Sequence, residues 1–235
     1  MFCGCGGMSL GFQNAGFDIV AAYDNWQPAI DIYQKNFHHP IYKKDLSTED
    51  IVPELRELAP DMIIGGPPCQ DFSIAGKREF RGKRANLSLK FGQIVSEVHP
   101  QWFVMENVYN IEKSPIFEEV LTIFKSAGYG VTKHVWDASY MGVPQMRRRY
   151  FVVGKLDEKD DFHRPIPSNY VIHPADKTSD LSQVHVLTTK ERSYIQSFPG
   201  SFEFVGKTSS IEQAIGNAVP VKMAEYVARV IADYP

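Results

Sequence analysis

One cysteine stands in a turn that would hold its thiol in a single direction. Residues 65–70 have the sequence Gly-Gly-Pro-Pro-Cys-Gln and follow a short apolar run. The prolines fix φ and the glycines let the chain bend, so Cys69 is expected in a stiff loop at a strand end. A free cysteine is usually a small buried apolar residue. Because this turn is a costly way to bury a thiol, we interpret Cys69 as a candidate nucleophile.

Three other side chains could assist that thiol. Glu106 follows a second apolar run, and Arg147 and Arg149 lie two positions apart. A thiolate can add to C6 of a cytosine if N3 of the ring receives a proton, which a carboxyl group with a raised pKa can donate from a dry pocket. Alternate residues of a strand face one side. Both arginines could therefore bind the base O2, a phosphate or Glu106, with Arg148 on the other side.

A glycine-rich loop opens the chain at residues 2–7, Phe-Cys-Gly-Cys-Gly-Gly. Glycines allow unusual dihedral angles and close approach of the backbone to a ligand. The dinucleotide fingerprint needs a glycine three positions after Gly6, where Ser9 stands, so that motif is not matched. An ordinary tight turn would have a similar composition, so the loop alone does not decide between a ligand-binding loop and such a turn.

Two acidic residues favour a ligand site. Asp24 ends the next predicted strand, where a carboxylate can accept hydrogen bonds from ribose hydroxyls. Asp45 ends a third and could accept one from an adenine amino group, while Phe2 could pack on the adenine ring. A nucleoside site without a pyrophosphate loop fits S-adenosylmethionine better than NAD.

The elements that must position these residues alternate along the chain. Buried strands are predicted at 18–23, 62–65 and 102–105, and helices at 28–37, 48–58 and 87–98. This order predicts an α/β fold, a Rossmann-like and mostly parallel sheet with helices on both faces. Ligands of such sheets bind at the carboxyl ends of the strands. Asp24, Cys69 and Glu106 are therefore expected at one edge.

The pattern changes after residue 154. Residues 1–154 form the predicted catalytic and cofactor-binding domain. Residues 155–186 are polar and contain breakers without periodicity, which predicts a linker or a small irregular appendage. Helical spacing returns at 188–198 and 221–234, so residues 187–235 are expected to pack back on the first domain as helices.

Composition narrows the classes of protein. No run of about 18 apolar residues is present, so no membrane span is expected, and the first residues lack the basic leader of an export signal. An odd set of cysteines, Cys3, Cys5 and Cys69, suits a reducing cytoplasm better than a disulfide framework. The first two have no second ligand pair at zinc spacing, so no metal is expected.

The formal charge of −3 argues against a protein that coats nucleic acid, although an enzyme needs only a local basic face. Basic residues do cluster, at 147–149 and within 77–84. A solvated surface is the other interpretation of these clusters.

Five short motifs occur along the chain: Phe-x-Gly-x-Gly-Gly at 2–7, Pro-Pro-Cys-Gln at 67–70, Glu-Asn-Val at 106–108, Gln-x-Arg-x-Arg at 145–149 and Gly-Asn-Ala-Val-Pro at 216–220. In their types and order they resemble those of the cytosine-C5 DNA methyltransferase family of bacterial type. The resemblance covers about residues 2–154 and 186–234. The resemblance implies methyl transfer from S-adenosylmethionine to C5 of a flipped cytosine in double-stranded DNA, through a covalent bond between Cys69 and C6.

The resemblance also implies three sets of site residues. The catalytic set is Cys69, Glu106, Arg147 and Arg149. The cofactor pocket would comprise Phe2, Gly4, Cys5, Gly6, Gly7, Asp24, Asp45, Leu46, Pro67, Leu87, Asn217 and Val219. Residues 70–84 would form a loop that closes on DNA, with contacts from Gln70, Ser73, Lys77, Arg78, Arg81, Lys83 and Arg84.

The chain departs from the family pattern in two places. A strand normally precedes the first motif, so either residues are missing before Met1 or another segment fills that place in the sheet. A large target-recognition region normally follows the arginine strand, whereas only residues 155–186 stand here. We expect that this region is lost or omitted, or that a second chain supplies it.

These features favour the modifying enzyme of a bacterial restriction-modification system, in the cytoplasm at the nucleoid. One alternative is a non-catalytic or partner-dependent cofactor-binding subunit, although the intact Cys69, Glu106 and arginines count against it. Another is a tRNA cytosine methyltransferase, which no residue selects. Nothing in the sequence indicates the recognition sequence or the oligomeric state.

Overall fold

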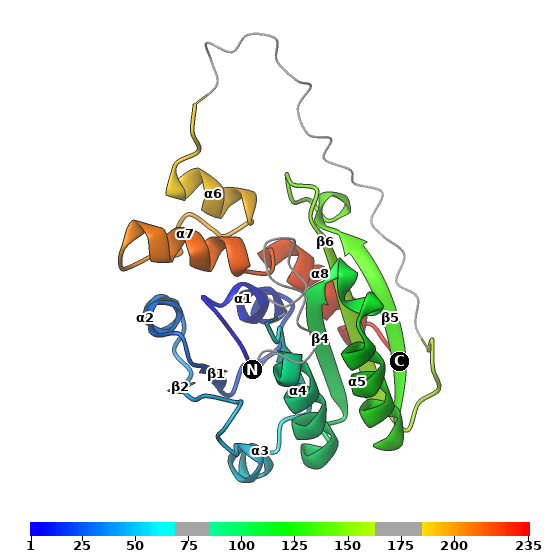
Figure 1. Ribbon diagram of the computed structural model, residues 1–235. Helices are drawn as coiled ribbons and strands as arrows, with labels where there is room; N and C mark the ends of the chain where they lie inside the picture. The colour runs from blue at the N-terminus through cyan, green and yellow to red at the C-terminus, as the bar shows by residue number, and fades with distance from the viewer. Residues whose placement is uncertain (69–84, 163–184) are drawn as a thin grey trace.

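The strands of the computed structural model, which describes residues 1–68, 85–162 and 185–235, form two sheets (Figure 1). A parallel pair consists of β1 (Ala22–Asp24) and β2 (Ile41–Lys43). The larger sheet has the order β3-β4-β6-β5, with β3 (Met62–Gly65), β4 (Trp102–Val108), β5 (Tyr129–Asp137) and β6 (Arg148–Leu156). Its β3 and β4 are parallel, and β6 is antiparallel to both β4 and β5.

Helices cover both faces of the larger sheet, which confirms the α/β class (Figure 1). One face packs on α4 and α5, and the other on α1 and α8. The helices are α1 (Gly7–Asn14), α2 (Gln27–Asn36), α3 (Val52–Leu58), α4 (Ala85–Val98), α5 (Pro115–Ser126), α6 (Thr189–Ile195), α7 (Thr208–Asn217) and α8 (Val221–Ala232). Short 3₁₀ turns occur at Tyr109–Lys113 and Ala138–Tyr140.

The first residues of the chain lie between the two sheets. The ammonium group of Met1 donates to the carbonyl of Ile64 at 2.7 Å, and the amide of Cys3 donates to the carbonyl of Tyr23 at 3.2 Å. The Met1 side chain belongs to the core on the α4 side. Residues 1–3 therefore connect β1 and β3 by one backbone hydrogen bond to each.

Several predicted boundaries differ from the observed ones. The strand expected at 18–23 begins only at Ala22, because its ladder is the short pairing with β2, and Asp18 and Val20 are exposed. The helix expected from residue 48 begins at Val52, after the Asp50 side chain accepts the amide of Val52 at 3.0 Å. The strand at 62–65 is confirmed, and the strand from 102 extends to Val108.

Three strands of the larger sheet, β3, β4 and β5, run in one direction and β6 runs against them, so the sheet is mostly parallel, as predicted, with one reversed strand. Hydrophobic periodicity does not encode strand direction, and β5 and β6 are joined by a connection too short for a parallel crossover. The strand β6 thus returns antiparallel and inserts between β4 and β5. The boundary expected at residue 154 falls inside this strand, and residues 163–184 of the predicted appendage lie outside the described ones.

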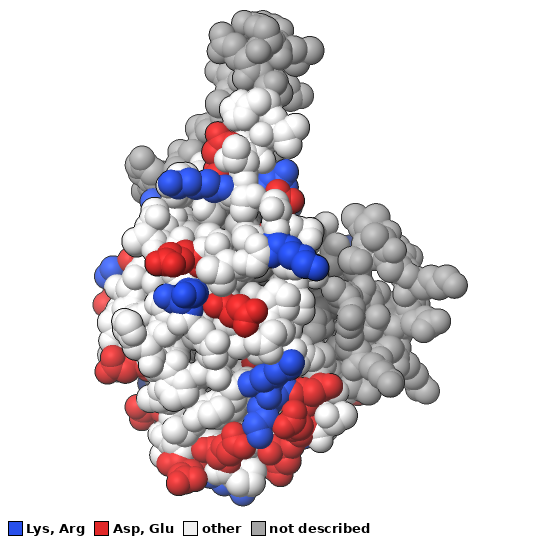
Figure 2. Space-filling view, turned by 90° about the vertical axis from the view of Figure 1, so that its left-hand side faces the viewer, with Lys and Arg blue, Asp and Glu red and all other residues white. Residues whose placement is uncertain are grey.

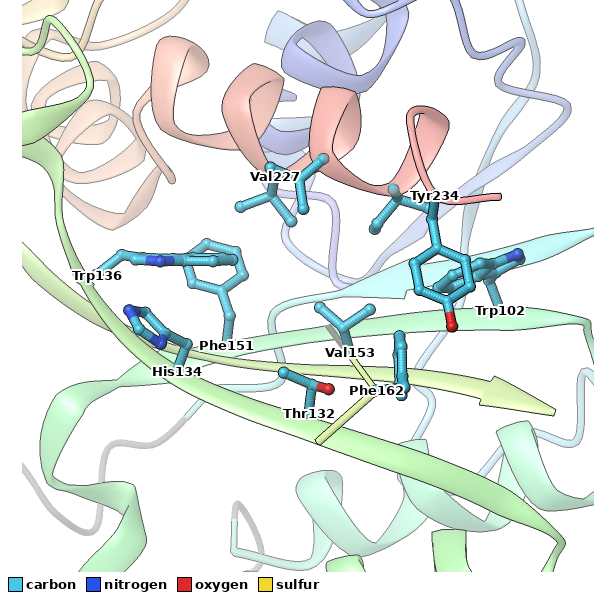
Figure 3. Close-up of a pocket in the computed structure, with 11 residues that line it drawn as sticks. Trp102, Thr132, His134, Trp136, Phe151, Val153, Phe162, Val227 and Tyr234 are labelled. Carbon is cyan, nitrogen blue, oxygen red and sulfur yellow. The ribbon is translucent and has the colours of Figure 1, made fainter. Parts of the chain in front are cut away.

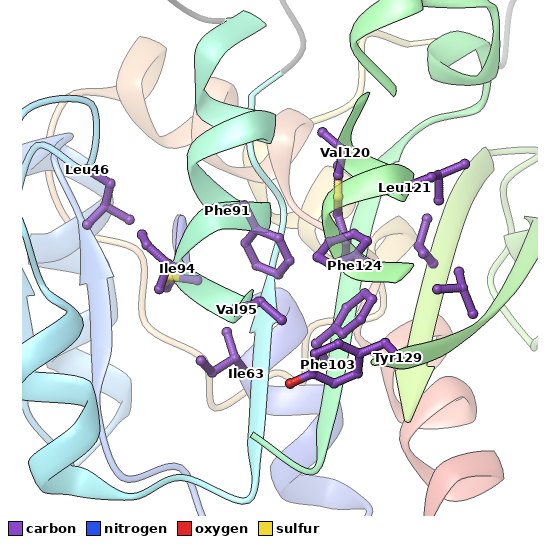
Figure 4. Close-up of a cluster of buried hydrophobic side chains, with 14 of the residues drawn as sticks. Leu46, Ile63, Phe91, Ile94, Val95, Phe103, Val120, Leu121, Phe124 and Tyr129 are labelled. Atoms are coloured by element: carbon purple, nitrogen blue, oxygen red, sulfur yellow. The ribbon is translucent and has the colours of Figure 1, made fainter. Parts of the chain in front are cut away.

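Aromatic rings dominate the core between the larger sheet and α4 and α5 (Figure 4). Phe103 and Phe124 stack with ring centroids 4.0 Å apart, and Phe91 meets Phe124 edge to face at 6.3 Å. The hydroxyl of Tyr129 donates to the carbonyl of Pro100 at 2.6 Å. This core fixes β4, which carries Glu106, against the helix that follows the cysteine loop in sequence. In the described part of the chain, no helix has the length and apolarity needed to cross a membrane.

The helices α1 and α8 approach each other so closely that one contact position requires glycine. A Cβ on Gly11 would lie 2.5 Å from the Cβ of Ala224 and 2.6 Å from the backbone carbonyl of Val221. The backbone of α8 cannot move away without separating from the sheet, since Val227 and Ala228 are fully buried. The glycine of α1 therefore sets the spacing of this helix pair.

We expect Gly11→Ala to destabilise the protein by about 1–3 kcal/mol, the usual cost of overpacking a core contact. The matched control is Gly92→Ala in α4, where the added carbon would meet Val120 and Ile123 at an ordinary 3.6 Å. Because alanine is the better helix former, this control should be neutral or stabilising by up to about 1 kcal/mol. Urea unfolding measures both, and equal midpoints for the two variants would contradict the assigned contact.

Candidate active site

The ends of three strands of the larger sheet meet at one edge. The carboxyl ends of β3 and β4 lie beside the start of the antiparallel β6. Glu106 on β4 faces the turn that follows β3, and a Cβ on Gly66 would lie 3.1 Å from its Oε2. Asp24 is the last residue of β1, as expected. The sequence-predicted residues of the described strands are thus gathered at strand ends.

Glu106 forms an ion pair with Arg149 across β4 and β6. Its Oε1 lies 3.0 Å from Nε of Arg149, and the two side chains are only 11% and 18% exposed. Burial raises the pKa of Glu106 above its usual 4.5, and the charges of Arg149 and Arg147 oppose that rise. The carboxyl group is therefore easier to protonate than an exposed glutamate, as the sequence interpretation required.

The turn before the cysteine is tied to β4 by Asn107. Its Nδ2 donates to the carbonyl of Pro67 at 3.0 Å, and its Oδ1 accepts the amide of Val108 at 2.8 Å. Asn107 is 4% exposed, and its bond to Pro67 is buried. Sequence reasoning gave this residue no role, although its place beside Glu106 in the Glu-Asn-Val motif was the available signal.

Arg147 and Arg149 contact different groups. Nη2 of Arg147 donates to the carbonyls of Gly216 and Ala218 at 2.8 and 3.2 Å, whereas Arg149 pairs with Glu106. Burial and the neighbouring charge of Arg149 lower the pKa of Arg147 to about 10. Arg148 is exposed and lies 3.6 Å from Asp137, which agrees with its predicted opposite orientation. Of the three partners considered for the arginines, Glu106 is the one within this chain, and Arg149 pairs with it.

Asp24 holds the glycine loop. Its Oδ2 accepts the amide of Gly4 at 2.8 Å and its Oδ1 accepts that of Trp26 at 2.9 Å. Each carboxylate oxygen keeps a lone pair for a further donor. A Cβ on Gly4 would meet nothing within 4 Å, so the loop presents open backbone there. Gly6 has φ of 99° and no room for a Cβ, which would lie 2.3 Å from the ring of Phe37.

The 216–219 turn packs against the same loop. A Cβ on Gly7 would lie 2.3 Å from the carbonyl of Val219. The Cys5 thiol is buried and lies 3.4 Å from the carbonyl of Ala214, so its side chain points into the protein and only its backbone is left for a ligand. Asn217 in this turn is exposed. The structure thus brings the first and last motifs of the sequence together.

The other predicted cofactor residues are more widely spread. Asp45 is exposed, and its Oδ1 accepts from the amide and hydroxyl of Ser47, which lowers the pKa of Asp45. Leu46 is buried in the core that contains Met1, and Leu87 is buried in the first half of α4. Pro67 is buried beside Asn107. Phe2 has a positive φ of 53° and is half-buried.

The remaining predicted residues lie outside the described ones. They are Cys69 and the DNA-binding set Gln70, Ser73, Lys77, Arg78, Arg81, Lys83 and Arg84. The described chain reaches Pro68 on one side and resumes at Ala85. Pro68, which follows the Pro67 carbonyl bound by Asn107, is the last described residue before the predicted nucleophile.

Two other features do not coincide with this site. A mostly apolar pocket under α8 is lined by Trp102, Trp136 and Tyr234 among others, but by none of the predicted site residues (Figure 3). The face shown in Figure 2 mixes acidic and basic side chains, with no continuous basic surface in its described part. Among the described residues, no group of three or more His, Cys, Asp or Glu side chains could hold a metal ion.

The sequence matches the profile of the family described as C-5 cytosine-specific DNA methylase, over residues 1–186 and 166–233. It is 42% identical to the type II methyltransferase M.HindV of Haemophilus influenzae, covering 100% of this chain and 95% of that protein. It is also 42% identical to M.HgiDI of Herpetosiphon aurantiacus, covering 100% and 93%. These alignments extend over 290 and 289 residues, so both relatives contain residues without a counterpart in the 235 here.

Solved structures share the fold. A DNMT2 variant of Spodoptera frugiperda superposes with a TM-score of 0.83 at 18% identity, covering 99% of this chain and 98% of that one. Dnmt2 of S. pombe gives 0.79 at 17% identity, covering 98% and 96%. At these identities the likeness establishes the architecture only.

The raised pKa of Glu106 makes stability depend on pH. The unfolded chain gives up this proton more readily than the folded one, so wild type should lose stability relative to Glu106→Gln as pH rises from 4.5 through the folded pKa. The change amounts to about 1.4 kcal/mol for each unit by which the pKa is raised.

Urea unfolding of both proteins at a series of pH values measures this difference. Glu119→Gln, which removes an exposed carboxyl group of α5, is the control. A stability difference that grows in the opposite direction, with wild type gaining on Glu106→Gln as pH rises, would contradict the raised pKa.

Proposed function

Because this chain belongs to the family of C-5 cytosine-specific DNA methylases, we propose that it methylates C5 of a flipped cytosine through a covalent bond between the sulfur of Cys69 and C6. It is a DNA cytosine-5-methyltransferase of the type II restriction-modification kind. The observation that carries the mechanism is the buried carboxyl of Glu106, ion-paired with Arg149 beside the turn that leads to Cys69.

In the first step, the Cys69 thiolate forms a bond to C6 while the C5–C6 double bond opens. Glu106 donates a proton to N3 as negative charge develops on the ring, which leaves C5 electron-rich. The carboxylate that remains is stabilised by the guanidinium of Arg149 at 3.0 Å. Burial, which raises the pKa of Glu106, thus favours the protonated acid before the reaction, and the nearby cation stabilises the carboxylate after it.

In the second step C5 would take the methyl group of S-adenosylmethionine, which would leave as S-adenosylhomocysteine, and a base would then remove the C5 proton. The electrons of that C–H bond restore the C5–C6 double bond and expel the thiolate from C6, and the N3 proton returns to the Glu106 carboxylate. The target base must leave the duplex for this chemistry, because the stacked ring offers no face to a side chain. Asn107 keeps the preceding turn fixed to β4 through Pro67, so the thiol would be presented near Glu106.

S-adenosylmethionine would supply the methyl group from its sulfonium centre. The described residues fit its nucleoside, since Gly4 presents open backbone and Asp24 retains acceptor capacity next to it. Phe2, Asp45, Leu46, Pro67, Leu87, Asn217 and Val219 are the further residues proposed for this pocket. Cys5, Gly6 and Gly7 would contribute through their backbone.

Double-stranded DNA is the proposed substrate. The basic residues of the 70–84 loop would bind phosphates, and the longer relatives support a reduced recognition region in this chain. The relatives align over all of it, which gives no support to a second chain that supplies recognition. Type II methyltransferases at 42% identity also favour DNA over the tRNA and non-catalytic alternatives.

The covalent step is tested with duplexes that carry 5-fluorocytosine in randomised flanking sequence, plus labelled S-adenosylmethionine. Fluorine at C5 cannot leave as a cation, so the enzyme should remain bonded to C6 as a complex that survives denaturation. We expect this complex with wild type and none with Cys69→Ser. The same duplexes with ordinary cytosine are the control and should be methylated without trapping. A complex of undiminished yield with Cys69→Ser would refute the assigned nucleophile.

The role of Glu106 is tested by turnover. We expect Glu106→Gln to bind S-adenosylhomocysteine as wild type does but to transfer methyl groups more slowly by about 10²-fold or more, the scale of general acid catalysis. Calorimetry gives the binding and labelled methyl transfer gives the rate. Unchanged turnover would remove Glu106 from the mechanism.

A further inference from the structure

The guanidinium of Arg147 is held at the end of α7. Its Nη2 donates to the carbonyls of Gly216 and Ala218 at 2.8 and 3.2 Å. The last carbonyls of a helix lack partners within it, and the helix dipole places negative charge there. A half-buried cation with two hydrogen bonds to this terminus therefore joins the residue just before β6 to the end of α7.

The backbone of Arg147 is fixed as well. Its amide donates to Oδ1 of Asp137 at 3.2 Å, and its carbonyl accepts the amide of Ala138 at 3.1 Å. The same Oδ1 accepts the amide and hydroxyl of Ser139. The arginine thus extends from an anchored position, so its contact with α7 constrains α7 and not the arginine alone.

The segment that Arg147 holds is one wall of the glycine loop. The carbonyl of Val219 would lie 2.3 Å from a Cβ on Gly7, and the carbonyl of Ala214 receives the Cys5 thiol. The carbonyl of Val221, two residues after Val219, would lie 2.6 Å from a Cβ on Gly11. A shift of the 216–219 turn would therefore open the contact with the first residues of α1.

We propose that Arg147 is a positioning residue for the cofactor site: it fastens the 216–219 turn against the glycine loop, while Glu106 and Arg149 serve the base. This inference rests on the proposed function, because it takes that loop and turn as walls of the S-adenosylmethionine pocket. It separates two arginines that the strand pattern treats alike. The buried Nε of Arg147 has no hydrogen-bond partner among the described residues, so the turn carbonyls are the acceptors of this side chain.

The test compares Arg147→Gln, Arg147→Lys and the matched Arg149→Gln. The dissociation constant of S-adenosylhomocysteine is measured by calorimetry without DNA, and KM and kcat are measured with DNA. Arg147→Gln loses the positive charge and the two hydrogen bonds from Nη2 to the carbonyls of Gly216 and Ala218. It should therefore weaken the binding of S-adenosylhomocysteine by about tenfold or more, since hydrogen bonds to charged groups are the stronger ones. Arg147→Lys keeps the charge and should give an intermediate loss. Arg149→Gln should leave binding unchanged and lower kcat.

Amide hydrogen exchange supplies a readout that does not need activity. Exchange across residues 214–221 should be faster in both Arg147 variants and unchanged in Arg149→Gln. If Arg147→Gln fails to fold, Arg147→Lys decides: faster exchange with weaker binding supports the proposal, and wild-type exchange overturns it.

Two outcomes distinguish failure of this inference from failure of the proposed function. If Arg147→Gln binds S-adenosylhomocysteine as tightly as wild type and only its kcat falls, the positioning role is overturned and Arg147 acts on the target cytosine instead. A wild-type protein that does not bind S-adenosylhomocysteine would instead refute the cofactor on which the proposed function depends.

Discussion

Glu106 and Arg149 meet across two antiparallel strands, and both side chains are largely removed from water. Transfer of two charges into a protein interior costs more free energy than an isolated ion pair usually returns. Burial accordingly raises the pKa of Glu106 even though a guanidinium touches it. The balance suits a carboxyl group that must hold a proton before the reaction and release it during the reaction. A solvated glutamate would be ionised, and a fully buried one without a cation would keep its proton.

The direction of β6 makes this balance possible. Its start lies beside the end of β4, with Val108 opposite Arg149 and Glu106 opposite Phe151. A parallel strand in the same place would bring its carboxyl end to this edge and carry its first residues to the far one. The short connection after β5 forces the reversal, and the same reversal brings Arg147 within reach of α7. The reversal of β6 therefore places Arg149 beside Glu106 and Arg147 beside the 216–219 turn.

Local patterns predicted much of this site from the sequence. The strand at 62–65, the strand that carries Glu106 and the helices that flank them follow from periodicity and from the proline and glycine residues. The pairing of Glu106 with Arg149 was one of three options, since alternation assigns a face but not a partner. The acceptors of Arg147 lie about seventy residues further along the chain and could not be read from spacing. The bond from Asn107 to Pro67 likewise depends on β3 and β4 being neighbours.

The glycine loop shows why the two ends of the chain have to be considered together. Gly4 leaves open backbone, whereas Gly7 and Gly11 are filled by the approach of Val219 and of α8. Glycine thus has opposite surroundings within one short segment: open space at Gly4 and close packing against a helix at Gly11. Asp24 binds the loop at Gly4, and α8 and the turn that precedes it close on the loop at Gly7 and Gly11, so the conformation of the loop depends on both ends of the chain. Because Arg147, just before β6, holds that turn and Arg149, within β6, pairs with Glu106, residues two positions apart contact both the wall of the glycine loop and the acid.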